Sequence, residues 1–185
     1  MMDDMQILKE LFKDDVLVDM KKKYSSNIAI LTEPQCSGSS VEINGVPDNT
    51  IIVKIDKFPD PSNLFNGNKG ECKRADYAII AEYRNKNRIL FIEMKKTKGS
   101  KKEIIQQLKG AGCILKYIQE IGQQFWNKAD FLTDFEYRFI SFGHTSIRKR
   151  KTRITKETSG THNSPENIMK IDWPANIRFN HLAGV

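Results

Sequence analysis

The sequence predicts a mixed α/β fold in which a central mixed sheet is flanked by helices. Two apolar runs, residues 76–83 and 88–95, are separated by four polar residues, a pattern typical of an antiparallel β-hairpin. A helical pattern begins at Ser100, and residues 136–142 form a further strand-like run. A helix between a hairpin and a later strand indicates a crossover connection, so the predicted order is a helix, two strands, the hairpin, a long helix and a further strand.

The elements before the hairpin are predicted from shorter patterns. Residues 3–23 are expected to form one helix, because apolar residues recur at helical spacing and lysines 21–23 suit the negative end of a helix dipole. Residues 27–32 and 50–55 are expected to be short strands, and residues 58–70 a loop.

The hairpin and the helix after it carry the clearest signals. The run 88–95 is apolar at both odd and even positions, which is typical of a central strand covered on both faces. The helix begins with Ser100 and has Glu103 three residues later, the spacing of a capping box. Near the end of the chain, residues 168–179 are expected to add an edge strand.

Length and charge limit the function classes. The 185 residues suffice for a single domain, and we expect its core at about residues 50–145, followed by a basic loop and C-terminal extension at 146–185. No apolar run approaches the roughly 18 residues of a membrane helix. The net charge is +7, with 10 basic and 12 acidic groups in residues 1–75 (−2) and 20 and 11 in residues 76–185 (+9). This asymmetry favours a polyanionic partner, nucleic acid before a membrane surface, and we expect no membrane partner.

The cysteines indicate a reducing compartment. Three cysteines is an odd number, and none of them forms a CxxC pair. The acidic N-terminus is not followed by the apolar segment of a signal peptide, so we expect a cytoplasmic protein with free thiols. Structural zinc is not expected, because the three histidines show no ligand spacing with the cysteines.

Charged residues gather at one end of the predicted hairpin. Centring its turn on Asn85 and Lys86 places Asp76 opposite Lys95, with Glu93 diagonally across. Two carboxylates and one ammonium group therefore converge at the end of a buried strand pair. One interpretation is a structural ion pair with a second, exposed acid. The other is a site for a hard divalent cation, Mg²⁺ or Mn²⁺, which offsets the charge that one lysine cannot neutralise.

The surrounding residues resemble a known superfamily. Asp76 in RADYAII, Glu93-Met94-Lys95 in ILFIEMK, Gln107 in QQLKGA and the following strand EYRFISF are similar to the motif of the PD-(D/E)xK nucleases. The resemblance covers residues 71–142, and alanine stands where the family name has proline. It implies a restriction-endonuclease-like core with the order αβββαβ, metal-dependent hydrolysis of phosphodiester bonds and, for a chain of this size, a homodimer.

The resemblance also implies roles for these residues. Asp76 and Glu93 would bind Mg²⁺ (or Mn²⁺) with help from the Met94 carbonyl. Lys95 would orient or help to deprotonate the attacking water, and Gln107 would hold Lys95 or the water. Some members add an acid from the first helix. Glu10 and Glu33 are equal candidates for this acid, and both are expected to be surface residues.

Basic segments near the predicted site are candidates for binding nucleic acid. We expect them to contact backbone phosphates, although a solvated loop explains the second segment equally well. The candidates are Lys96 and Lys98 in the first segment, and Arg148, Lys149, Arg150, Lys151 and Arg153 in the second.

Three functions follow from these observations. The first is a metal-dependent endonuclease or exonuclease that acts on DNA in preference to RNA. The second is a nuclease-fold module that binds nucleic acid or assembles with partners but does not catalyse. The third is an RNA-cleaving toxin or defence effector of similar fold.

Overall fold

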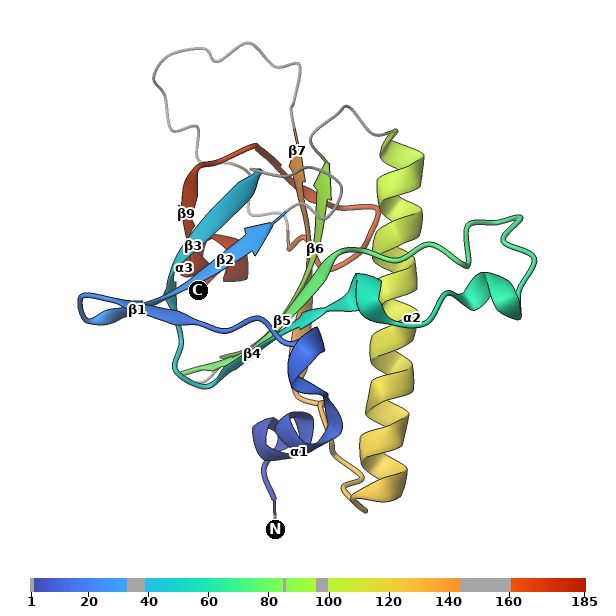
Figure 1. Ribbon diagram of the computed structural model, residues 1–185, viewed down its shortest axis with the longest axis horizontal. Helices are drawn as coiled ribbons and strands as arrows, with labels where there is room; N and C mark the ends of the chain where they lie inside the picture. Colours follow the sequence, from blue (N-terminus) through green and yellow to red (C-terminus); the bar gives the residue numbers. More distant parts are fainter. Residues whose placement is uncertain (1, 33–38, 85, 96–99, 144–160) are drawn as a thin grey trace.

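The computed structural model describes residues 2–32, 39–84, 86–95, 100–143 and 161–185. It contains a mixed five-stranded sheet in which neighbouring strands lie in sequence order (Figure 1). The first three strands are antiparallel, and the last three are parallel. These strands are β4 (Thr50–Lys54), β5 (Tyr77–Tyr83), β6 (Lys86–Lys95), β7 (Phe135–Gly143) and β8 (Met169–Asp172).

The long helix α2 (Lys101–Phe125) connects β6 to its parallel neighbour β7, as the predicted crossover requires. The side chain of Ser100 caps it by accepting a hydrogen bond from the Glu103 N–H at 3.1 Å. The mixed α/β class, the hairpin, the crossover helix and the strand after it are therefore confirmed. The expected edge strand near the end of the chain is confirmed as β8.

A second, four-stranded sheet was not predicted from the sequence. It covers the face of the larger sheet opposite α2, together with the short helix α3 (Phe179–Ala183). The prediction of flanking helices therefore holds for one face only. The strands, in spatial order, are β1 (Lys21–Lys23), β2 (Ser26–Thr32), β3 (Ser40–Val46) and β9 (Asn176–Arg178).

The N-terminal helix α1 (Asp4–Leu11) is much shorter than the helix predicted for residues 3–23. A 3-10 turn follows at Asp14–Val16, and the chain then pairs with β4 through a backbone hydrogen bond from Val18 to Ile52 at 2.9 Å. The apolar residues after α1 were therefore wrongly assigned to a helix. Their backbone groups are satisfied by the neighbouring strand, which a local pattern does not contain.

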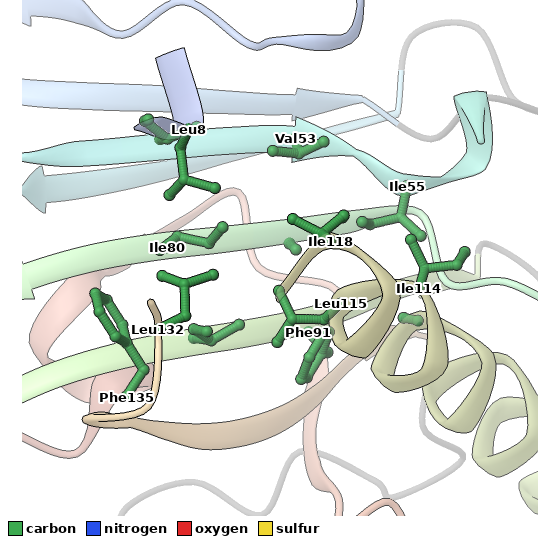
Figure 2. Close-up of a cluster of buried hydrophobic side chains, with 14 of the residues drawn as sticks. Leu8, Val53, Ile55, Ile80, Phe91, Ile114, Leu115, Ile118, Leu132 and Phe135 are labelled. Carbon is green, nitrogen blue, oxygen red and sulfur yellow. The ribbon is translucent and has the colours of Figure 1, made fainter. Parts of the chain in front are cut away.

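Two cores lie on the two faces of the larger sheet. The helix-side core is formed by α1, α2 and the facing side chains of the sheet. The sheet-side core lies between the two sheets and α3. Figure 2 labels part of the helix-side core: Leu8, Val53, Ile55, Ile80, Phe91, Ile114, Leu115, Ile118, Leu132 and Phe135.

The predicted loop at residues 58–70 is confirmed, with 3-10 turns at Ile55–Lys57 and Pro61–Asn63 around its start. Its far end is held against α2, because the Gln106 amide donates to the Lys69 carbonyl at 2.7 Å. The next residues pass so close to α2 that a Cβ on Gly110 would lie 1.7 Å from the Lys73 carbonyl oxygen. The glycine therefore allows the segment that leads into β5 to pack on the helix.

Two further expectations concern thiols and membranes. Cys72 and Cys113 are free, while Cys36 lies outside the described residues. Within the described ranges, no helix is both long and apolar enough to cross a membrane.

Candidate functional site

The hairpin of β5 and β6 brings the predicted carboxylates together, but in a different register. Tyr83 pairs with Lys86, so the turn has two residues and Arg84 takes a φ of +55°. The predicted register is therefore wrong by two residues. Tyr77 pairs with Ile92, and by continuation Asp76 lies opposite Glu93 rather than Lys95.

Both carboxylates lie on the sheet face covered by α2. Side chains alternate along a strand, so Glu93 shares this face with Phe91, and Asp76 shares it with Ala78. Glu93 is fully buried, and its Oε1 lies 3.2 Å from the Nζ of Lys95. The Lys95 side chain keeps 19% of its surface exposed, so this ion pair lies at the edge of the core.

Main-chain groups fix Asp76 from both neighbouring strands. Its Oδ2 accepts a hydrogen bond from the Met94 N–H at 2.6 Å. Its own carbonyl accepts from the Ile55 N–H, just after β4, at 2.8 Å. The carboxylate is therefore held beside β6 without dependence on a flexible side-chain contact.

The charge of Lys95 follows from its surroundings. Burial alone lowers its pKa, but the nearby Glu93 carboxylate, followed by Glu103 and Asp76, raises it, and the net pKa is above its ordinary value. Lys95 is therefore an ammonium ion at neutral pH. Glu103 was interpreted from the sequence only as part of a helix cap. Its Oε1 also lies 3.8 Å from the Nζ of Lys73, and its charge acts on Lys95, so it belongs to the charged residues around Lys95. Its spacing from Ser100 predicted the cap and contained no signal for the second role.

Gln107 lies near the start of α2, where Ile104 and Leu108 pack into the helix-side core. Its Oε1 is buried and has no hydrogen-bond partner in the described part of the chain. An unsatisfied buried amide oxygen is costly, so this oxygen is suited to accept a hydrogen bond from a water or a bound ligand.

The donors at this point suit a hard divalent cation. Asp76 and Glu93 offer carboxylate oxygens, and Met94 offers a main-chain carbonyl between Glu93 and Lys95. The described residues contain no group of three or more His, Cys, Asp or Glu side chains that could hold a metal. Mg²⁺ needs fewer protein ligands than that, because it keeps several waters when one or two carboxylates bind it. The residues present therefore fit Mg²⁺ or Mn²⁺ and do not fit zinc.

Other predicted residues lie elsewhere. Glu10 accepts a hydrogen bond from the Trp126 indole at 3.0 Å, at the opposite end of α2 and about 28 Å along the helix axis from Gln107. The structure therefore does not bring Glu10 to the site. The remaining predicted residues lie outside the described residues: Glu33, Lys96, Lys98, Arg148, Lys149, Arg150, Lys151 and Arg153.

Comparison of the chain with protein-family models, curated proteins and solved structures gives no match. The site must therefore be interpreted from its own geometry.

Proposed function

We propose that this protein is a metal-dependent nuclease that hydrolyses phosphodiester bonds, in DNA rather than RNA. One observation carries the proposal. Asp76 and the fully buried Glu93 face the same side of neighbouring strands, with the Lys95 ammonium 3.2 Å from Glu93. Like charges gathered in a buried place cost stability, and such arrangements are concentrated at functional sites.

The topology around the site supports the same proposal. When β1, β2 and β3 of the second sheet are set aside, the remaining elements α1, β4, β5, β6, α2 and β7 have the order αβββαβ that the resemblance to PD-(D/E)xK nucleases implies. Glu93 and Lys95 lie in β6, Asp76 directly precedes β5, and Gln107 lies in the helix that follows them. These positions are compatible with the roles that the resemblance implies.

Each residue has a distinct role in the proposed reaction. Asp76, Glu93 and the Met94 carbonyl would hold Mg²⁺, which when bound supplies positive charge to the phosphate and makes a bound water more acidic. Lys95 carries its proton, so it orients a water and stabilises negative charge that develops on the phosphate oxygens. Gln107 accepts a hydrogen bond from that water or from Lys95. Burial of Glu93 excludes bulk water and strengthens these electrostatic interactions.

The charge distribution supports a polyanionic substrate. Residues 76–185 contain all five of these residues and carry nine more basic than acidic groups, whereas residues 1–75 carry two more acidic than basic groups. A positive field around the site would attract a nucleic acid and make its binding dependent on salt.

The decisive experiment replaces Glu93 with its neutral isostere. In Glu93→Gln we expect the cleavage rate to fall about a thousandfold or more, because the charge that holds the cation is lost while the shape is kept. Cleavage of duplex DNA, single-stranded DNA and RNA would be measured with Mg²⁺, with Mn²⁺ and with a chelator. The matched control is Glu136→Gln on β7, which makes the same change on an exposed side chain at the other end of the sheet.

The result has a clear interpretation when thermal unfolding shows that both variants are folded. Equal activity of Glu93→Gln and wild type would remove the site from the mechanism. A folded wild-type protein that leaves every substrate intact would contradict the nuclease proposal. Titration with Mn²⁺, repeated on Asp76→Asn, would then show whether the site binds a cation without cleaving.

A further inference from the structure

The hairpin of β1 and β2 projects from the edge of the second sheet (Figure 1). Lys23 pairs with Ser26, so Tyr24 and Ser25 form its two-residue tip. Every residue from 21 to 26 is exposed. The projecting hairpin therefore contributes nothing to either core through these side chains.

Tyr24 at the tip is unusual in two independent ways. Its surface is 97% exposed, which is rare for a large aromatic side chain. Its φ is +57°, a left-handed backbone conformation that tyrosine rarely adopts and glycine adopts readily. Neither packing nor backbone preference explains tyrosine here. Exposed aromatic rings and strained backbone conformations are both associated with binding.

The lysines of β1 are presented on both faces of the hairpin. Alternation along the strand puts Lys21 and Lys23 on one face and Lys22 on the other. Lys23 forms an ion pair with Glu42 on β3 at 3.1 Å. Lys21 and Lys22 form no ion pair with a described residue, so their charges are available to a partner.

Protection of a sheet edge explains only part of this pattern. Short edge strands rich in lysine prevent unwanted pairing between molecules, and β1 is such a strand. This role requires no aromatic ring at the tip. It also gives no reason to retain a tyrosine where glycine relieves the backbone.

We propose that the hairpin of β1 and β2 is a nucleic-acid contact in which Lys21 and Lys22 bind phosphates on opposite sides and Tyr24 stacks on a base. A two-stranded ribbon fits the major groove of DNA, where both of its faces meet a phosphate-lined wall. A flat membrane surface would contact only one face. The inference rests on the proposed function, because it names a second contact for the same substrate.

The fold relates this contact to the candidate site. β2 leads from the tip to Thr32, whose carbonyl accepts a hydrogen bond from the Tyr77 hydroxyl at 2.7 Å, next to Asp76. The strand between Ser26 and Thr32 spans about 20 Å, and the site lies beyond Thr32 on the other face of the larger sheet, so the separation exceeds the roughly six base pairs that β2 alone covers. DNA substrates whose duplex ends within this distance of the cleaved bond should therefore gain no binding affinity from the hairpin.

The test measures binding of fluorescent duplex and single-stranded DNA by the full chain in a chelator, so that cleavage is prevented. Tyr24→Gly should weaken binding about tenfold and leave thermal stability equal or higher, since glycine accepts the positive φ. Tyr24→Phe keeps the ring and should bind like wild type. Lys21→Gln with Lys22→Gln should lower the slope of affinity against salt by about two on duplex DNA. The control is Lys9→Gln with Lys13→Gln, which removes the same charge from two exposed residues at and after α1.

The outcomes separate this inference from the proposed function. Hairpin variants that bind DNA like wild type overturn the inference, even if the wild type cleaves DNA with Mn²⁺. Weakened binding by these variants supports it, even if no cleavage is found. A wild-type protein that binds no nucleic acid overturns both. A last assay measures binding to vesicles that contain phosphatidylserine. Hairpin variants that lose only vesicle binding and keep DNA binding also overturn the inference.

Discussion

The two ends of strand β6 carry charged clusters that differ in the contacts they make. At the carboxyl end, Glu93 and Lys95 face α2 and lie beside Asp76 on the neighbouring strand. At the amino end, Arg88 is on the opposite face and is also buried. The strand therefore carries an acid paired with a lysine at one end and a buried arginine at the other, and the two groups lie on different sides of the sheet.

The side chains of the arginine cluster bind other segments of the same chain. The Nε of Arg88 donates to the Ala183 carbonyl at 3.1 Å, at the end of α3, and its Nη1 lies 2.8 Å from Glu136. The neighbouring Arg138 donates to the Thr161 carbonyl at 3.3 Å, and its pKa is lowered by burial and then by the charge of Arg88. Among the side-chain nitrogens of these two arginines, the Nε of Arg138 is buried without a hydrogen-bond partner in the part of the chain described.

The comparison shows that buried charge alone does not indicate a functional site. The arginines fasten distant segments of the chain to the sheet and so have a structural role. At the carboxyl end, two acids approach each other across neighbouring strands with one ammonium group beside them. The contacts of these acids lie within adjacent strands, and the approach of two acids costs stability, which is why the proposed site lies there.

The sharpest way to disturb the carboxyl end alone is Gly110→Ala. Its new Cβ would lie 1.7 Å from the Lys73 carbonyl oxygen, so the segment leading to Asp76 must move. We expect a loss of about 3 kcal/mol in the free energy of unfolding and a large loss of cleavage. Urea denaturation and the cleavage assay measure the two effects.

The control for this substitution lies two residues away on the same helix. A Cβ on Gly112 would meet no described atom within 4 Å beyond its own helix and chain neighbours. Gly112→Ala should therefore stabilise the protein by about 0.5–1 kcal/mol through helix propensity. Equal stability of the two variants would show that the close approach at Gly110 does not hold the segment before β5.

The contrast between these ends explains what could be predicted from the sequence. The cap at Ser100 and the two apolar runs that form β5 and β6 are local signals, and their secondary structure was predicted correctly. The hairpin register depends on the backbone conformation of Arg84, which the residue type does not reveal. The pairing of β3 with β9, as of Ile43 with Ile177, joins distant parts of the chain and has no local signal.

The second prediction concerns the amino end of β6, where we expect substitutions to change stability and leave cleavage activity unchanged. Arg88→Met should lower the free energy of unfolding by about 2 kcal/mol, because the Ala183 carbonyl loses its donor. Glu136→Gln removes only the exposed partner and should cost less than about 1 kcal/mol. Cleavage per folded molecule should be unchanged in both variants. Lower cleavage by folded Arg88→Met would show that the two ends are coupled.

The smallest predicted effect tests whether every polar group at the carboxyl end belongs to the site. The Tyr77 hydroxyl donates to the Thr32 carbonyl and accepts from the Thr32 N–H at 3.3 Å, so it joins the two sheets. Its side chain lies in the sheet-side core, away from the face that carries Asp76. Tyr77→Phe should therefore lower the free energy of unfolding by about 1 kcal/mol and leave cleavage unchanged.

The pH dependence of this effect has a definite sign. Burial raises the pKa of Tyr77, against the smaller opposing effect of the hydrogen bonds with Thr32. The folded state therefore holds the phenol proton more tightly than the unfolded state, whose pKa is about 10. This stabilisation is complete below pH about 10 and is lost as the pH rises through the pKa of the folded state. Denaturation at pH 7 and at pH 11 measures the free energy of unfolding of wild type and Tyr77→Phe. The advantage of the wild type should be smaller at pH 11 than at pH 7, or should reverse. A difference that stays constant with pH would contradict the raised pKa of Tyr77, whereas reduced cleavage at neutral pH would place Tyr77 among the groups that act on the substrate.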